Sequence, residues 1–243
     1  MNEERDNRGD APKTVDPIGP RELRFMNSRA RELLLRYWDF PVLASLMRKH
    51  AVTLENASVL DVGCGSGYTT LLISERFSPL KLDAFDIVPG QVELARSRGI
   101  DANIFVGDIT DPKLPERSFD AVFICGVLHH CPEWRTGLAR VANLLRDGGV
   151  LLLEEPDSRH IKLETLLMGR PPANGAWTGL AALRREMGPV GLSIVEERSL
   201  FFGLFGSFLC VKMAETHARD YIMARNLLRT PASDVATGQE VPA

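Results

Sequence analysis

Three glycines at alternate positions follow a short apolar segment. Residues 59–68 read VLDVGCGSGY, and an amphipathic helical pattern comes after them. Glycine tolerates positive φ and lets backbone N–H groups approach a ligand closely, and the helix behind directs its partly positive N-terminus at the same place. The stretch therefore predicts a ligand site around Asp61, Gly63, Gly65 and Gly67. The alternative is a tight structural turn without a ligand.

The glycine spacing separates the classes of ligand. A dinucleotide fingerprint, G-x-G-x-x-G, would need a glycine at the position of Tyr68, whereas here the third glycine comes one residue early. A nucleotide-triphosphate loop would end in Gly-Lys-Ser/Thr, which is absent. The pattern therefore disfavours an NAD-linked oxidoreductase.

Two further acids follow the next two predicted strands. A carboxylate at Asp86 can accept hydrogen bonds from both hydroxyls of a ribose; the alternative is an N-cap for a helix entering at Pro89, and Asp83, inside the strand, is the weaker candidate. Asp108 follows Gly107 and can accept a hydrogen bond from an exocyclic amine such as adenine N6, or it can serve as a turn residue.

Strand-like and helical patterns alternate through the middle of the chain. Strands are predicted at 58–62, 81–87, 102–106, 119–125 and 150–154, helices at 68–77, 89–98 and 133–146, a turn-rich loop through Pro112 and Pro115, and a turn at 147–149. Such alternation with short links predicts a parallel sheet covered on both faces.

The flanking regions differ in pattern. Two helices are expected ahead of the main domain, the second starting at Pro41. After the main strands we expect two helices, near 158–168 and 178–187, separated by Pro171-Pro172. A hairpin of 192–197 with 205–213 and a last helix at 214–228 follow them. We expect a disordered lead-in (1–20), a helical cap (21–55), the main domain (56–213, with a variable acceptor-side insertion at 156–190) and a helix with a disordered tail (214–243).

The glycine turn, Asp86 and Asp108 together resemble the class I S-adenosylmethionine-dependent methyltransferases over residues 57–155. The resemblance implies an α/β fold, with a Rossmann-like, mostly parallel seven-stranded sheet, helices on both faces, a C-terminal antiparallel hairpin and an N-terminal helical cap. It also implies S-adenosylmethionine as the cofactor. By resemblance, the methionine part of the cofactor lies among Asp61, Gly63, Cys64, Gly65 and Gly67, and Cys125 lines the pocket. Asp86 binds the ribose, and Ile87 packs against the adenine. Asp108 accepts a hydrogen bond from adenine N6, and Ile109 flanks the adenine ring.

The segment Leu128-His129-His130 resembles the small-molecule and quinone-type, methyltransferase type 11-like, branch of that family. The Asn/Asp-Pro-Pro-aromatic box of many nucleic-acid methyltransferases is missing, so a nucleic-acid partner is disfavoured. A neutral imidazole can accept a proton near pH 7, which makes His129 and His130 candidate general bases, His129 the better one; capping or packing is the alternative. Cys125 is expected to act as a small hydrophobe and not as a nucleophile.

Three segments near the predicted acceptor side have two interpretations each. Glu154, Glu155 and Asp157 could bind a cationic acceptor or a metal, but we favour helix capping and solvent exposure and see no metal triad. The basic segment 21–50 could be a lid over an aromatic or anionic acceptor; we favour an amphipathic helix pair with a solvated basic face. Residues 200–205 suit a hairpin core better than a lipid contact.

Composition narrows the class of protein. The net charge of −3 and pI near 6.0 do not call for nucleic acid or an anionic membrane. Four cysteines without paired short spacing favour a reduced, cytoplasmic compartment, and the acidic, polar N-terminus argues against a secretory signal. The longest apolar run, 200–211, is shorter than the roughly 20 residues of a membrane-spanning helix.

The sequence thus predicts an enzyme that methylates oxygen, nitrogen or carbon of a small molecule, such as a secondary metabolite, a quinone or a lipid-linked acceptor. Three alternatives stay open. The chain could be a cofactor-binding regulatory subunit without turnover, an RNA methyltransferase or, least favoured, an NAD-linked oxidoreductase.

Overall fold

Strand β1 (Ser58–Val62), which leads into the glycine turn, is an interior strand of a seven-stranded sheet in the computed structural model, beside the central strand β4. The model describes residues 20–111, 118–168, 177 and 179–213. The strand order is β3-β2-β1-β4-β5-β7-β6, with β7 antiparallel to both of its neighbours and the other pairs parallel. The other strands are β2 (Lys81–Asp86), β3 (Asn103–Val106), β4 (Phe119–Cys125), β5 (Leu145–Pro156), β6 (Leu192–Leu200) and β7 (Phe205–Lys212). The predicted fold class is confirmed.

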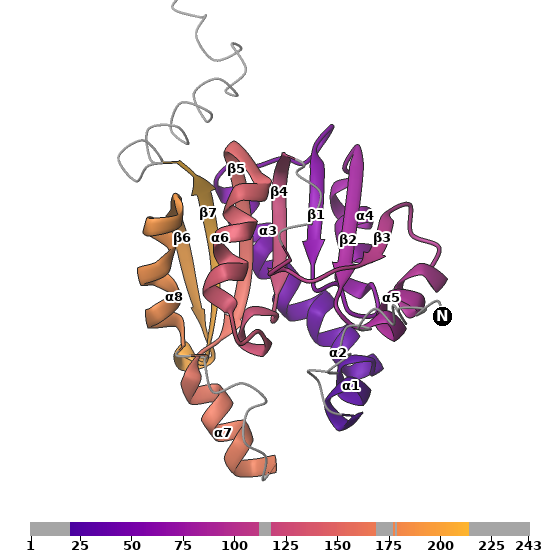
Figure 1. The fold of residues 1–243 in the computed structure, drawn as a ribbon, viewed down its shortest axis with the longest axis vertical. Coiled ribbons are helices and arrows are strands. Elements are labelled where there is room, and N and C mark those ends of the chain that lie inside the picture. Colours follow the sequence, from indigo (N-terminus) through magenta and orange to yellow (C-terminus); the bar gives the residue numbers. More distant parts are fainter. Residues whose placement is uncertain (1–19, 112–117, 169–176, 178, 214–243) are drawn as a thin grey trace, which may run out of the picture.

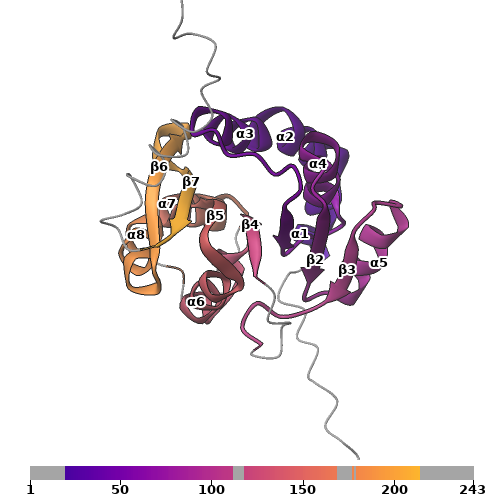
Figure 2. The same ribbon diagram turned by 90° about the horizontal axis from the view of Figure 1, so that it is seen from above.

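Helices cover both faces of this sheet (Figure 2). One face carries α3 (Phe40–Lys49), α4 (Tyr68–Phe77) and α5 (Pro89–Ser97), and the other carries α6 (Trp134–Leu144) and α8 (Leu180–Met187). Strand side chains alternate between faces, so Phe123 of β4 packs with the rings of Phe40 and Phe77, while its neighbour Ile124 belongs to the core around Trp134. Every interior strand is therefore apolar on both sides, as parallel sheets require.

The second N-terminal helix begins at Pro41 within one residue, as predicted, but it directly continues the helical turns before it. Helix α1 (Pro20–Met26) ends before Ser28, which caps α2 (Arg29–Leu34); a π-helical turn, η1 (Leu35–Asp39), then continues directly into α3. Pro41 lies in the first turn of α3 and cannot donate a backbone hydrogen bond. The helix is locally wider here, because the N–H of Phe40 donates to the carbonyl of Leu35, five residues earlier, which is the spacing of a π turn.

Strand β5 begins earlier than predicted. The turn expected at 147–149 lies inside the strand, because Leu145 already pairs with Phe119 and the register shifts before Val150 pairs with Ala121. An irregular ladder can absorb such extra residues without ending the strand. Strand β6 likewise extends beyond the predicted end, to Leu200. The loop at Pro112 and Pro115, the Pro171-Pro172 break and the helix predicted at 214–228 lie outside the described residues.

Helices α1, α2 and α7 (Ser158–Met168) lie beyond the carboxyl ends of the parallel strands, at the bottom of Figure 1. Three short helices, η2 (Leu128–His130), η3 (Gly188–Val190) and η4 (Phe201–Gly203), connect the larger elements. Ligands of open α/β sheets bind outside the carboxyl ends of the strands. In the described part of the chain, no helix has the length and apolarity to cross a membrane.

Candidate functional site

The glycine turn after β1 combines an open position with a closely packed one. Gly63, Gly65 and Gly67 have φ values of 66°, 53° and 83°. A Cβ on Gly65 would meet no atom within 4 Å, whereas one on Gly67 would lie 2.8 Å from Cβ of Ala95. Gly67 therefore permits the close packing of the turn on α5, and the backbone at Gly65 faces open space in which a ligand can lie.

The carboxylate of Asp86 ties this turn to the end of β2. Its Oδ2 accepts a hydrogen bond from the N–H of Gly65 at 2.9 Å, and its Oδ1 accepts one from the N–H of Val88 at 2.9 Å. Helix α5 has Val88 as its N-cap residue and no side-chain cap, so Asp86 does not cap the helix. A carboxylate oxygen can accept about two hydrogen bonds, so these two contacts are compatible with a role in binding ribose hydroxyls. The ribose role stays a prediction.

Asp61 is a buried carboxyl group beneath the turn. The hydroxyl of Thr70 donates to its Oδ2 at 2.6 Å. Burial raises the pKa of Asp61 to about 7, and the nearby charge of Asp86 acts in the same direction. A buried anion in this position is stabilised by a cation, and the amino group of an amino-acid ligand would supply one.

The predicted adenine contacts divide into exposed and buried ones. Oδ1 of Asp108 accepts hydrogen bonds from the N–H and the hydroxyl of Thr110, both at 2.8 Å, so this carboxylate organises its own turn. Ile87 is exposed at the edge of the sheet and available to a flat ligand. Ile109 is buried against α6, where a Cβ on Gly137 would lie 3.1 Å from its Cγ2.

The two cysteines assigned to the pocket are poor nucleophiles. Cys64 is buried among residues that include Val92 and Ala95 of α5, so its backbone and not its side chain belongs to the turn. Burial raises the pKa of the Cys64 thiol, and burial beside Glu154 raises that of Cys125 well above its ordinary value.

A second group of charges approaches from the N-terminal helices. Asp39 of η1 is buried and pairs with Arg31 of α2 at 2.6 Å. Burial raises the pKa of Glu154, at the end of β5, to about 8, and the charge of Asp39 acts in the same direction. The described site therefore gathers the carboxyl groups of Asp39, Asp61 and Glu154 with the guanidinium of Arg31, and a cationic ligand such as S-adenosylmethionine fits this charge balance. Among the described residues, no group of His, Cys, Asp and Glu side chains could hold a metal ion.

Glu155 organises the segment that carries the two histidines. This fully buried carboxylate accepts hydrogen bonds from the N–H groups of Val127 and Leu128 at 2.8 and 2.7 Å, and it lies 2.8 Å from Nδ1 of His129. A carboxylate only accepts, so this contact favours the tautomer in which Nδ1 of the neutral ring carries the hydrogen and Nε2 the lone pair. Burial, with the charge of His129 adding to it, lowers the pKa of His130 to about 3, which makes His130 a poor proton acceptor at neutral pH.

The role of Glu155 was missed in the sequence, where capping or exposure was favoured. Exposure is wrong for Glu154 and Glu155, which are both buried. Capping is confirmed for Asp157, whose carboxylate accepts hydrogen bonds from the backbone N–H groups of Arg159 at 3.1 Å and Leu180 at 3.3 Å. The pairing of Cys125 with Glu154 brings the end of β5 beside the turn after β4. The sequence signal for this role was the pair of acids, Glu154 and Glu155, at the end of a predicted strand.

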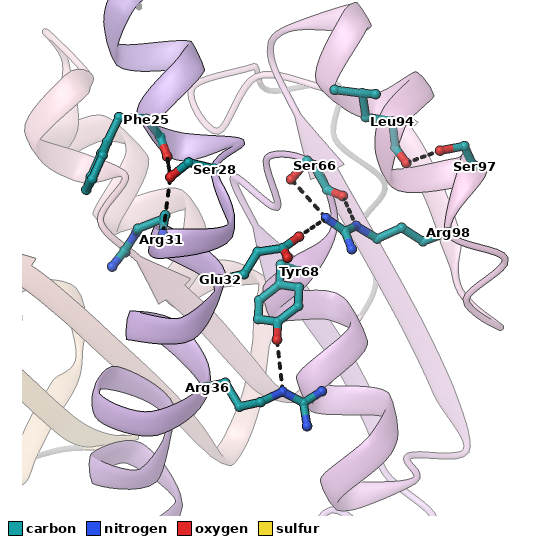
Figure 3. Close-up of polar contacts among 10 residues, drawn as sticks. All are labelled: Phe25, Ser28, Arg31, Glu32, Arg36, Ser66, Tyr68, Leu94, Ser97 and Arg98. Atoms are coloured by element: carbon teal, nitrogen blue, oxygen red, sulfur yellow. Dashed lines mark hydrogen bonds and ion pairs between the residues drawn. The ribbon is translucent and has the colours of Figure 1, made fainter.

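Two arginines attach the N-terminal helices to the glycine turn (Figure 3). Arg98 donates from Nε to the carbonyl of Ser66 and from Nη2 to Glu32 of α2, each at 2.5 Å. On the other side of the turn, Arg36 of η1 donates to the hydroxyl of Tyr68 at 2.9 Å. The expectation of a solvated basic face is wrong for Arg31, which is largely buried in its pair with Asp39, whereas Arg36 stays partly exposed while it contacts Tyr68.

Comparison with known proteins finds matches around the glycine turn and the strands that follow it. A model described as "Methyltransferase domain" matches residues 59–149. Trans-aconitate 2-methyltransferase from Methylobacterium radiotolerans is 34% identical over 118 residues, which are 49% of this chain and 45% of that protein. The first curated relatives are matched over 36% to 58% of their own length, so the chain spans about half of them.

Two solved structures share the fold. A chain of the complex between the Haloferax volcanii Trm112 methyltransferase activator and a putative methyltransferase superposes with a TM-score of 0.63 and 18% identity, over 79% of this chain and 98% of that one. Magnesium protoporphyrin IX methyltransferase from Synechocystis PCC 6803, solved with bound S-adenosylhomocysteine, gives a TM-score of 0.56 at 22% identity, over 71% and 81% of the two chains.

The substitution Asp61→Asn tests the charge beneath the turn. Burial raises the pKa of Asp61 from 3.8 to about 7. The neutral carboxyl group of the folded protein therefore contributes stability that is complete below pH 3.8 and is lost as the pH rises through 7. We expect D61N to raise the melting temperature at pH 8 by on the order of 3 °C, with a smaller gain at pH 5, and to weaken S-adenosylhomocysteine binding about tenfold or more. Thermal melts at both pH values and calorimetry measure these effects; equal losses of stability at both would contradict the assignment.

Replacement of Arg98 tests the attachment of the N-terminal helices. Arg98→Gln removes the contacts with Ser66 and Glu32, and we expect S-adenosylhomocysteine affinity to fall about fivefold to tenfold. Arg96→Gln is the matched control, because Arg96 lies on the same helix but donates to the carbonyl of Ile104. Calorimetry on both variants decides: a similar loss in R96Q would assign the effect to α5 as a whole.

Proposed function

We propose, on the premise that residues 59–149 form a class I S-adenosylmethionine-dependent methyltransferase domain, that this protein transfers a methyl group from S-adenosylmethionine to a small-molecule acceptor. One observation carries the proposal. The backbone at Gly65 opens onto free space and is held in place by Asp86, directly above the buried carboxyl group of Asp61.

Each part of the site has a role in this reaction. The glycine turn and Asp61 hold the amino-acid end of the cofactor, and Asp86 holds its ribose. S-adenosylmethionine supplies a methyl group on a positively charged sulfur, which is an activated leaving group. The chain contributes chiefly by positioning the reactants and excluding water. The carboxyl groups of Asp39 and Glu154 favour binding of the cationic cofactor and do not accelerate the transfer step itself.

His129 serves as the general base for a hydroxyl acceptor. Its Nε2 takes the proton that the hydroxyl loses while the oxygen bonds to the methyl carbon; the electron pair of the broken carbon–sulfur bond stays on sulfur, leaving S-adenosylhomocysteine. Glu155 stabilises the imidazolium that forms and holds the ring in the required tautomer. Nitrogen and carbon acceptors are alternatives that need no dedicated base, and the acceptor class includes secondary metabolites, quinones and lipid-linked molecules.

Other functions for the same fold have weaker support. A regulatory subunit without turnover would need the cofactor residues but not the pairing of His129 with Glu155. RNA methylation would need a basic groove along the carboxyl edge of the sheet, where the described site gathers carboxyl groups. A cytoplasmic location, which four free cysteines favour, stays a prediction.

Ligand binding followed by turnover tests the proposal. We expect S-adenosylhomocysteine to raise the melting temperature of the whole chain by several degrees and NADH to leave it unchanged, because only binding to the folded state stabilises. Release of S-adenosylhomocysteine from S-adenosylmethionine in the presence of a panel of hydroxyl, amine and carbon acceptors then measures transfer. Stabilisation by NADH but not by S-adenosylhomocysteine would overturn the proposed methyl transfer. Binding of S-adenosylhomocysteine without turnover on any acceptor would favour the regulatory subunit.

The substitution Glu155→Gln tests the base. A glutamine amide would donate to Nδ1 of His129 and place the hydrogen on Nε2, so we expect turnover of a hydroxyl acceptor to fall about 10²- to 10⁴-fold. S-adenosylhomocysteine affinity should stay unchanged, and nitrogen NMR of His129 should report the altered tautomer. Glu197→Gln, which removes a surface ion pair with Arg184, is the control. Full turnover in E155Q with an altered tautomer would show that His129 is not the base.

A further inference from the structure

Four aromatic rings from three distant segments meet at the carboxyl edge of the sheet. The ring of Trp38 in η1 stacks on Phe201 of η4, with centroids 5.1 Å apart and planes at 19°. Phe201 meets Phe205 of β7 edge-on at 5.9 Å, and His160 of α7 lies 4.4 Å from Phe205. We call these four residues the aromatic wall.

Both ends of the aromatic wall continue into the candidate site. Phe205 pairs across the strands with Pro156, and the next pair along brings Gly206 opposite Glu155, the carboxylate that binds His129. At the other end, Trp38 directly precedes Asp39, whose charge acts on Glu154. The wall therefore lies at the carboxyl edge of the sheet, next in register to Glu155 and next in sequence to Asp39.

The turn that carries Phe201 is strained and open, unlike the hairpin core expected from the sequence. Phe201 and Phe202 have φ values of 50° and 57°, a region that side chains with a Cβ adopt at an energetic cost. The side chains of Trp38 and Phe201 are 48% and 46% exposed, and Phe202 is fully exposed. Both residues lie in the turn that joins β6 to β7, where positive φ is common but is usually adopted by Gly, Asn or Asp and not by phenylalanine.

We propose that the aromatic wall binds a flat, unsaturated acceptor ring and so selects hydroxyarenes as the substrates of the proposed methyl transfer. This inference deepens the proposed function and rests on it. The stacked pair of Trp38 and Phe201 presents partly exposed ring surface, and aromatic groups prefer to associate through offset or edge contacts with such rings. A ring held there places its hydroxyl toward the edge of the sheet that carries His129 and Glu155.

The hydroxyl group of such a ring also suits the base. A phenolic hydroxyl loses its proton more readily than an aliphatic one, so a single imidazole at His129 is enough to assist it near neutral pH. A saturated ring of the same size would be thicker, would stack less well and would hold its proton more tightly. The wall and the base therefore select for the same chemical class.

Binding of matched aromatic and saturated probes to the full chain tests this proposal. With the protein saturated by S-adenosylhomocysteine, we expect calorimetry to show hydroquinone and 2-naphthol binding at least tenfold more tightly than cyclohexane-1,4-diol and decahydro-2-naphthol. Tryptophan fluorescence gives a second readout: of the three tryptophans, Trp134 and Trp177 are buried, so acrylamide quenching reports on Trp38. Hydroquinone should protect Trp38 from acrylamide, and the diol should not.

Two matched variants assign the effect to the wall. Trp38→Leu should weaken binding of both aromatic probes about tenfold and leave S-adenosylhomocysteine affinity unchanged. Tyr37→Leu is the control, because Tyr37 is adjacent to Trp38 in the sequence but is 71% exposed and is not part of the aromatic wall. Equal affinity for aromatic and saturated probes, absence of saturable binding, or equal effects of W38L and Y37L would each overturn the inference. Failure of the wild type to bind S-adenosylhomocysteine would instead overturn the proposed function.

Discussion

Backbone N–H groups in the turns after parallel strands have no partner within the sheet, and this protein gives them carboxylates. Asp86 receives the N–H groups of Gly65 and Val88, one from each of two neighbouring turns. Glu155 does the same for the turn after β4 and also binds the ring of His129. Leaving such buried donors unpaired would cost on the order of 1–3 kcal/mol each. The site geometry follows from this requirement, because each carboxylate fixes a ligand-binding or reacting group as well as a loop.

The same edge of the sheet also gathers carboxyl groups that are buried away from water. Asp61, Glu154 and Asp39 are all buried, and burial raises the pKa of each. Arg31 offsets part of this charge from the N-terminal helices. A bound cationic ligand would offset more of the charge of these carboxyl groups. Binding of the cofactor should therefore raise the stability of the folded protein. The contacts of Arg36 and Arg98 with the turn then matter for more than packing, because they keep the compensating helices in place.

The sequence was most informative where local chemistry decides the structure. Glycines with positive φ between a buried strand and a helix allow few arrangements, so the turn at Gly63 to Gly67 and the strand before it were predicted with correct bounds. The prediction failed where partners come from elsewhere in the chain. Nothing local indicates that Glu155 meets His129 or that Arg98 meets Ser66, since neighbouring strands and helices bring these pairs together.

The helix start predicted at Pro41 is confirmed, but the helical turns on its two sides are continuous and not separate helices. Proline does remove a backbone donor, but the chain responds with a π turn and continues. A π turn inserts one extra residue, which changes the direction of the side chains around it relative to an ordinary helix. Trp38 and Asp39 occupy this turn, one contributing to the aromatic wall and the other to the acid cluster. Because π turns occur often at functional sites, the turn that precedes Pro41 helps to shape the site as well as leading into α3.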